Sequence, residues 1–303
     1  MQFVLILLPV FGIFLIGFIG QKALKFEIPN LSKLTLYLMS PFLAFSVFYS
    51  HPVSLDYLYL AVYIFALCSI LIFVVYLVSK FMGYSLADRC ALILSSAFMN
   101  NGNYGTPVIL LVFGEKGLAI AVILMVLQQL AMSTIGVYYA AKGSEDGGGM
   151  KLVWRRVIRM PIAYGALLGF LFQLLHIPLA DPILTCIDLV GNAAIPTIMI
   201  VLGMQLAVIS FREIEFLKVG FGLLIRLLLS PVIAFLLTLL LPVDTMTKQI
   251  MVILAVMPTA ANTTLLAVQF RTKPDLVSST TFISTVLSIV TLPIALWAAQ
   301  LFI

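Results

Sequence analysis

The sequence predicts an all-α integral membrane protein with ten transmembrane helices. Of its 303 residues, 63% are hydrophobic and 10% are charged, whereas soluble domains carry roughly 25% charged residues. The apolar residues gather in ten segments that are long enough to cross a bilayer as helices. The fourth and ninth segments contain turn-forming residues at lipid depth. Together these observations predict a 5+5 inverted repeat in which helices 4 and 9 are broken and cross.

The first predicted span has no basic residue before it and no small-residue cleavage pattern after it, so we expect a retained helix rather than a signal peptide. The ten predicted spans are 3–21, 31–50, 57–80, 89–113, 117–141, 157–176, 182–208, 215–241, 248–270 and 274–302. The charged, glycine-rich stretch 142–156 is expected to be a linker. It separates a first five-helix repeat, 1–141, from a second, 157–303.

Basic residues alternate between the two ends of the predicted spans. Of the 17 Lys and Arg residues, all but Lys116, Lys248 and Arg226 follow odd-numbered spans. Cytoplasmic loops are enriched in Lys and Arg, so the linker 142–156 is expected in the cytoplasm and both termini outside. The expected location is a bacterial inner (plasma) membrane.

The two halves of the chain resemble each other. The segment LPVFGIFLIGF (8–18) is similar to MPIAYGALLGF (160–170). The matched positions are Pro9 with Pro161, Gly17 with Gly169, Pro41 with Pro196, and Asn103 with Asn262. Because each half has an odd number of spans, the second half must be inverted relative to the first. Inverted repeats with helix breaks at matching positions are typical of secondary transporters.

Turn-forming residues interrupt the fourth and ninth spans. NNGNYGTP (100–107) lies between two apolar runs, and MPTAANTT (257–264) contains Pro258, which removes a backbone donor. Inside a membrane, irregular backbone is tolerated only where it is buried in protein or lines a wet cavity. The two breaks are therefore expected to meet near the midplane. Half-helix N-termini there suit an anion, and freed carbonyls suit a cation.

NNGNYGTP and VMPTAANTTLLAVQF (256–270) resemble the auxin efflux carrier family, which includes plant PIN carriers and bacterial dicarboxylate permeases for malonate or malate. The resemblance covers essentially the whole chain. It implies a scaffold domain, a transport domain that moves in an elevator-like manner, and an organic anion bound at the crossover. The linker is short, as in bacterial members, so auxin is not implied. Plant carriers have an acid in the third span, whereas 57–80 has none beyond Asp56 at its mouth.

The candidate substrate-binding residues are the polar and turn-forming residues of the breaks and of nearby spans. They are Asn100, Asn101, Gly102, Asn103, Tyr104, Gly105, Pro107, Gln128, Gln129, Arg226, Pro258, Thr259, Asn262 and Thr263. The amides can bind substrate or cap half-helices, and Tyr104 can pack or act as a gate. Adjacent Gln128 and Gln129 point to different helix faces, so at most one faces the crossover. A sodium ion could be ligated by Thr259, Asn262, Thr263 and Thr264.

Two charged residues lie within predicted spans. Arg226 could attract a carboxylate substrate or respond to a coupling proton, or it could reach the interface or contact backbone carbonyls. Asp188, near Asn192, could carry a proton or be a capped interfacial acid. The repeat mates Pro41 and Pro196 are expected to shape their helices.

Catalytic motifs are missing from the sequence. Its two histidines, His51 and His176, lie near predicted span ends, and no nucleophile, zinc or nucleotide motif occurs. We expect no enzyme activity, cofactor, structural metal or nucleic-acid partner, and energy from a proton or sodium gradient. A homodimer could form through the first, second, sixth and seventh spans. The alternatives are a sodium-coupled symporter or exchanger of a related inverted-repeat family, and a non-transporting membrane sensor.

Overall fold

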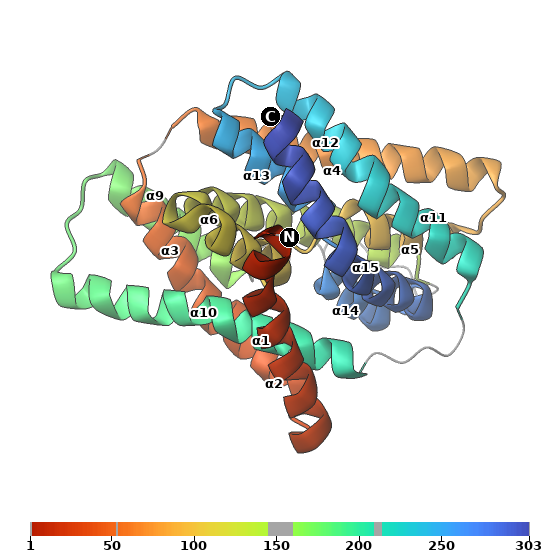
Figure 1. Ribbon diagram of the computed structural model, residues 1–303, viewed down its shortest axis with the longest axis horizontal. Helices are drawn as coiled ribbons and strands as arrows, with labels where there is room; N and C mark the ends of the chain where they lie inside the picture. The colour runs from red at the N-terminus through yellow and green to blue at the C-terminus, as the bar shows by residue number, and fades with distance from the viewer. Residues whose placement is uncertain (1, 53, 145–159, 209–213, 303) are drawn as a thin grey trace. The chain divides into compact units, whose positions relative to one another are not determined.

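The chain folds into α-helices and short π-helical turns (Figure 1). The computed structural model describes residues 2–52, 54–144, 160–208 and 214–302, and no β-strand occurs within these ranges. In this part of the chain, 7 helical stretches are long and apolar enough to cross a membrane. The prediction of an all-α integral membrane protein is confirmed, while the count of ten spans stays a prediction.

The contacts between residues divide the chain into two compact units. Unit 1 comprises Met1–Leu60, Gly102–Leu127 and Arg159–Val208, and unit 2 comprises Ala61–Asn101, Gln128–Ile158 and Ile209–Ile303. Each unit draws on both halves of the sequence. The division into repeats 1–141 and 157–303 stays a prediction, and most of the linker 142–156 lies outside the described residues.

Unit 1 holds the helices of the predicted first, second, sixth and seventh spans. Its elements are α1 (Gln2–Leu24), α2 (Ile28–Lys33), η1 (Leu34–Met39), α3 (Ser40–Ser50), α9 (Pro161–Leu174), α10 (Asp181–Val208) and most of α6 (Thr106–Ala131). Helix α10 packs against α1 and α3, and α3 packs against α9 (Figure 1). Pro41 follows the π-helical turn η1, whereas its repeat mate Pro196 lies inside an uninterrupted α10.

Glycines bring the helices of unit 1 into backbone contact. A Cβ added at Gly17 of α1 would lie 2.1 Å from the carbonyl oxygen of Ile200 in α10. A Cβ added at Gly169 of α9 would lie 2.5 Å from the carbonyl oxygen of Phe45 in α3. In lipid, helix association depends on such close packing because there is little hydrophobic driving force between helices. These two glycines therefore fix how closely their helices approach.

Unit 2 contains two short helices, α5 and α13, whose C-terminal ends both lie within the unit. Its elements are α4 (Asp56–Phe81) from Ala61 onward, α5 (Leu86–Ala97), η3 (Met132–Gly136), α7 (Val137–Lys142), α11 (Phe216–Leu224), η4 (Ile225–Leu229), α12 (Ser230–Leu239), α13 (Thr245–Val256), α14 (Ala261–Phe270) and α15 (Pro274–Phe302). Helix α15 packs against α5, α11, α13 and α14. Ser85 caps the N-terminus of α5 and Asp244 that of α13.

The predicted fourth and fifth spans meet within α6. Two helical segments join there at Gly114, which is not helical, with φ 66° and ψ −160°. A residue with a side chain rarely adopts this conformation, whereas glycine does so without steric cost. The connection is therefore a sharp kink at a single residue.

A charged cluster surrounds the start of α5 in unit 2. The ammonium of Lys218 lies 2.9 Å from the Asp88 carboxylate and also pairs with Glu215, and that of Lys273 lies 3.7 Å from Asp88. Burial opposes ionisation of Asp88. Hydrogen bonds from Lys218 and Ser85, together with the lysine charges, outweigh burial and hold the Asp88 pKa below its ordinary value.

Candidate functional site

Two interrupted helices of unit 2 meet through their main chains. Helix α5 ends at Ala97 and helix α13 ends at Val256. Beyond these ends, Met99 and Thr259 form an antiparallel β-bridge. The backbone nitrogen of Asn100 donates to the Pro258 oxygen at 2.9 Å, and that of Ala260 donates to the Phe98 oxygen at 3.0 Å. We call residues 98–100 and 257–260 the bridge. It satisfies main-chain groups of the two non-helical stretches that follow the helices.

The interruption in the ninth predicted span follows from local chemistry. Pro258 has no N–H and cannot continue helix α13. The nitrogen of Met257 donates to the Leu254 oxygen at 3.2 Å, which closes the last turn. Helix α14 then begins at Ala261, so Asn262, Thr263 and Thr264 lie in its first turn instead of in the break.

The interruption in the fourth predicted span lies earlier than expected. It covers residues 98–100, whereas most of NNGNYGTP (100–107) is helical. Asn101–Gly105 form the π-helical turn η2, and α6 follows directly with Pro107 as its second residue. Most of the asparagines and glycines of this stretch therefore lie in a π-helical turn after the break. Such π-helical turns are frequent at functional sites.

The candidate residues of this stretch fall in both units. Asn100 and Asn101 are buried members of unit 2, whereas Asn103 is a buried member of unit 1. In unit 1, a Cβ added at Gly102 would lie 3.3 Å from the Met125 sulfur. The Tyr104 ring is fully buried, with its centroid 5.1 Å from that of Phe14. This contact matches the packing role predicted for Tyr104.

Arg226 donates hydrogen bonds to the C-terminal ends of both α5 and α13. It lies in the π-helical turn η4 of unit 2, and none of its surface is exposed. Its Nη1 donates to the Ser96 carbonyl oxygen at 3.0 Å, and its Nη2 donates to the Ala255 carbonyl oxygen at 2.6 Å and to the Ser230 hydroxyl. Ser96 and Ala255 belong to the last turns of α5 and α13. Of the roles predicted for Arg226, contact with backbone carbonyls is the one observed, and the full burial excludes a side chain that reaches the interface.

The electrostatics explain why an arginine is tolerated here. The C-terminal end of a helix carries roughly half a negative charge. Arg226 lies against two such ends and forms no ion pair within the described residues. The two helix ends therefore offset part of the guanidinium charge, and no carboxylate among the described residues pairs with it.

The N-terminal end of α14 offers groups of opposite character. Its N-cap residue, Ala260, supplies no side-chain hydrogen bond. The Asn262 Oδ1 atom is buried and has no hydrogen-bond partner among the described residues. The Thr263 hydroxyl donates to the Ala260 oxygen at 2.7 Å. A helix start with few local caps suits an anion. The Asn262 Nδ2 atom can donate to such an anion, whereas its unpaired Oδ1 atom can only accept a hydrogen bond.

A polar stripe on α15 supports the bridge and was missed in the sequence. The Ser284 hydroxyl accepts from the Thr259 nitrogen at 3.1 Å, and the Thr281 hydroxyl lies 3.0 Å from that of Thr264. The Thr259 hydroxyl donates in turn to the Ser95 oxygen at 2.5 Å. Buried Ser and Thr recur along α15 at helical spacing, at positions 281, 284, 285 and 288. This periodicity within an apolar span was the signal that could have revealed the stripe.

Gln128 is the better candidate of the two adjacent glutamines. Its side chain, in unit 2, is 3% exposed, and neither amide atom has a hydrogen-bond partner among the described residues. Gln129 is only half-buried. An unpaired buried amide is costly, so Gln128 is poised for a ligand or a water molecule.

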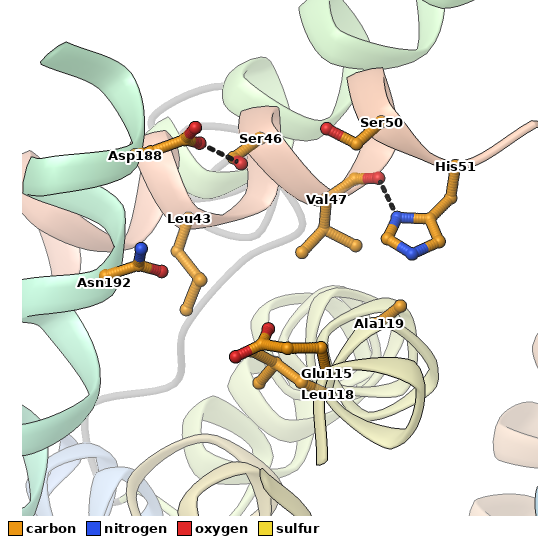
Figure 2. Close-up of a pocket in the computed structure, with 10 residues that line it drawn as sticks. All are labelled: Leu43, Ser46, Val47, Ser50, His51, Glu115, Leu118, Ala119, Asp188 and Asn192. Carbon is orange, nitrogen blue, oxygen red and sulfur yellow. Dashed lines mark hydrogen bonds between the residues drawn. The ribbon is translucent and has the colours of Figure 1, made fainter. Parts of the chain in front are cut away.

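A separate cavity of about 250 Å³ lies in unit 1 and includes Asp188 (Figure 2). Its lining residues are Leu43, Ser46, Val47, Ser50, His51, Glu115, Leu118, Ala119, Asp188 and Asn192. The Ser46 hydroxyl donates to Asp188 at 2.5 Å, and Nδ1 of His51 lies 2.9 Å from the Val47 oxygen. With Glu115 and Asp188 on its walls, this cavity suits a cation or a neutral polar group better than an anion.

The helical fold, the membrane-length helices and the bridge define an integral membrane protein with the features of a transporter. The chain belongs to the membrane transport protein family, whose model matches residues 3–147 and 149–296. This result confirms the resemblance to the auxin efflux carrier family that the two motifs predicted. The protein is therefore a membrane transport protein, as the sequence indicated.

Three curated proteins illustrate the similarity. An "Uncharacterized transporter" of Methanothermobacter thermautotrophicus is 32% identical over 75% of this chain and 73% of its own. One of Methanocaldococcus jannaschii is 30% identical over 88% of this chain and 87% of its own. A "Putative malonate transporter" of Rhizobium meliloti is 25% identical over 94% of this chain and 92% of its own. All three similarities extend over most of both chains.

Proposed function

We propose that this protein is a secondary active transporter of small organic anions, either dicarboxylates or aromatic carboxylates, and that it binds them at the bridge. The observation that carries the proposal is the fully buried Arg226, which contacts both half-helix ends and has no carboxylate partner among the described residues. A buried positive charge that lacks a counter-ion favours an anionic ligand. The relative named "Putative malonate transporter" is consistent with a dicarboxylate.

The groups around the bridge suit a carboxylate. The start of α14 adds roughly half a positive charge. Asn262 supplies an amide at that helix end, and Gln128 is a buried amide of the same unit with no partner among the described residues. In this proposal, Arg226 acts through the field of its charge because its guanidinium is held by backbone carbonyls, while the amides contact the substrate. Asn100 and Asn101, which also belong to unit 2, complete the site, and Asn103 of unit 1 stays a predicted substrate-binding residue.

We also propose the ten-span, 5+5 inverted repeat. Two contacts in unit 1 support it, because Gly17 approaches Ile200 as its repeat mate Gly169 approaches Phe45. Ile200 lies four residues after Pro196, and Phe45 lies four residues after Pro41, which is the repeat mate of Pro196. The two contacts therefore join equivalent positions of the two halves.

The proposed mechanism is alternating access of the elevator type, as the family resemblance implies. The helices of the predicted first, second, sixth and seventh spans would form the scaffold, and the bridge would travel with the transport domain. The distribution of Lys and Arg supports a cytoplasmic linker and external termini in the plasma membrane. The scaffold spans are also the proposed homodimer surface.

Uptake into proteoliposomes tests the function. The purified protein is offered labelled malonate, malate and aromatic acids, with and without sodium or pH gradients. Asn103→Ala and Asn262→Ala are each expected to abolish uptake while the melting temperature changes little. Asn192→Ala, in the cavity of unit 1, serves as a matched control and should retain uptake. Normal uptake by both Asn103→Ala and Asn262→Ala would refute the proposed site, and loss of uptake in the control alone would place the site at the cavity of unit 1.

A further inference from the structure

We infer that Arg226 is a tethered cation that occupies a cation-binding site built from the C-terminal ends of α5 and α13. Sodium is therefore not bound at this end of the bridge. The inference rests on the proposed function only for its consequence in transport. The occupancy of the site by Arg226 can be tested on the purified protein alone.

The ligands around Arg226 are those of a hard-cation site. Two main-chain carbonyl oxygens, from Ser96 and Ala255, and the hydroxyl of Ser230 surround the guanidinium. The Ser230 hydroxyl also donates to the Ala255 oxygen at 3.1 Å, which orients it within the group. In transporters with discontinuous helices, unwound carbonyls and half-helix C-termini coordinate sodium. Here a side chain of the protein holds that position.

The charge balance agrees with one resident cation. Each helix C-terminus contributes at most roughly half a negative charge, which falls off within the last turn, so the two ends attract the guanidinium and offset part of its positive charge. Removing the guanidinium would leave the carbonyl oxygens of Ser96 and Ala255 without this donor, and they would line a space of negative potential. A small cation from solution could then enter. With Arg226 present, the site is already filled by a cation of the protein itself.

Arg226 is also held too firmly to leave the site during transport. Its side chain is fully buried in unit 2, and its contacts come from three separate helical elements, α5, α13 and α12. The charged cluster of Lys218, Asp88 and Glu215 lies elsewhere in the unit and does not include it. No carboxylate among the described residues forms an ion pair with the guanidinium.

The side chains predicted as sodium ligands lie at or next to the N-terminus of α14, whereas Arg226 contacts helix C-termini. Thr263 and Thr264 lie in the first turn of α14, where the helix dipole is positive. The hydroxyls of Thr259 and Thr263 donate to carbonyl oxygens of Ser95 and Ala260. This end of α14 therefore favours an anion, whereas the end filled by Arg226 favours a cation.

The first experiment measures the melting temperature of the wild-type protein in detergent with sodium chloride, potassium chloride or choline chloride at equal ionic strength. Because Arg226 fills the site, the three salts should give the same melting temperature, and uptake into proteoliposomes should be the same with sodium or choline outside. Stabilisation specific to sodium, or uptake that requires sodium, would overturn the inference.

The second experiment vacates the site with Arg226→Ala and adds millimolar guanidinium, sodium or choline chloride. We expect the variant to melt at a lower temperature and to take up substrate about tenfold more slowly, equivalent to about 1.4 kcal/mol. Guanidinium should restore both properties, sodium should restore part of the stability, and choline should restore neither. Lys80→Gln removes an exposed cation at the end of α4 and should respond to none of the three.

The outcomes separate this inference from the proposed function. Rescue of stability by guanidinium in a protein that transports no organic anion would support the tethered cation and refute the function. Normal stability and uptake of Arg226→Ala without any added cation would refute the tethered cation and the contribution of Arg226 to anion binding, whereas organic-anion transport itself would stand. If Arg226→Ala does not fold, Arg226→Lys is the second variant: retained folding without sodium-specific stabilisation supports the inference, and stabilisation by sodium refutes it.

Discussion

The carbonyl oxygen of Pro258 accepts a 2.9 Å hydrogen bond from the backbone nitrogen of Asn100. Each residue lies just beyond the end of a half-helix, and the pair sets the register in which the two chains meet. Main-chain atoms alone form this contact, so side chains of the bridge can be substituted singly without removing it. The effects of such substitutions therefore report on the surrounding polar contacts.

Thr259→Val is expected to destabilise unit 2. The Thr259 hydroxyl donates to the Ser95 oxygen at 2.5 Å, and valine has the same shape without a donor. The Ser95 carbonyl would lose this donor in a buried setting, which costs about 1–3 kcal/mol. The melting temperature of Thr259→Val in detergent should fall. That of Thr259→Ser, which keeps the hydroxyl, should fall less. Equal melting temperatures for valine and threonine would show that this bond contributes nothing.

Gly17→Ala is expected to loosen the contact between α1 and α10. The added methyl would lie 2.1 Å from the Ile200 oxygen, so the helices must separate, and such overpacking costs about 1–3 kcal/mol. Gly12 is a matched control in the same helix, because a Cβ there meets nothing within 4 Å. Gly12→Ala should be neutral or stabilising, by up to about 1 kcal/mol. Thermal melting of both variants checks this, and equal effects would contradict the close approach.

The sequence predicted those parts of the fold that depend on local chemistry. Pro258 breaks its helix as predicted, because a missing N–H acts within one turn. The prediction placed the first break at 100–107, whereas the structure has it at 98–100. The sequence could not show this, because turn-forming residues can also lie in a π-helical turn. The sequence identified Gly17 and Gly169 as equivalent positions of the two halves. Their close contacts with Ile200 and Phe45 could be seen only in the structure.

The role of Arg226 could not be predicted in full. Its partners are main-chain carbonyls of Ser96, 130 residues away, and Ala255, 29 residues away. Carbonyl groups occur at every residue and leave no signature in a sequence. The same reasoning applies to the two units, since each collects non-adjacent segments whose association depends on long-range packing.

Asp88 is expected to make unit 2 sensitive to acid. Its pKa lies below the ordinary value in the folded protein, so its ionised form stabilises the fold. That contribution is present above the unfolded pKa of about 4 and is lost as the pH falls through the lower folded pKa. The melting temperature of the wild type should therefore drop below about pH 4. Asp88→Asn should melt lower at neutral pH and show a weaker drop, whereas an unchanged drop would assign it to other carboxyl groups.

Gln128→Leu distinguishes a ligand-binding amide from a structural one. The Gln128 side chain is buried, and its amide atoms have no hydrogen-bond partner among the described residues. Replacing an unsatisfied polar group by an apolar group of similar size is close to neutral or stabilising. If the amide serves the substrate, Gln128→Leu should keep or raise the melting temperature while uptake falls at least about tenfold, equivalent to about 1.4 kcal/mol.

The neighbouring Gln129, half-buried in the same helix, provides the control for Gln128. Gln129→Leu should change uptake little, because adjacent side chains point to different faces of the helix. A lower melting temperature of Gln128→Leu with unchanged uptake would mean that the amide stabilises helix packing. Since the two roles move stability and uptake in opposite senses, one pair of measurements on each variant decides between them.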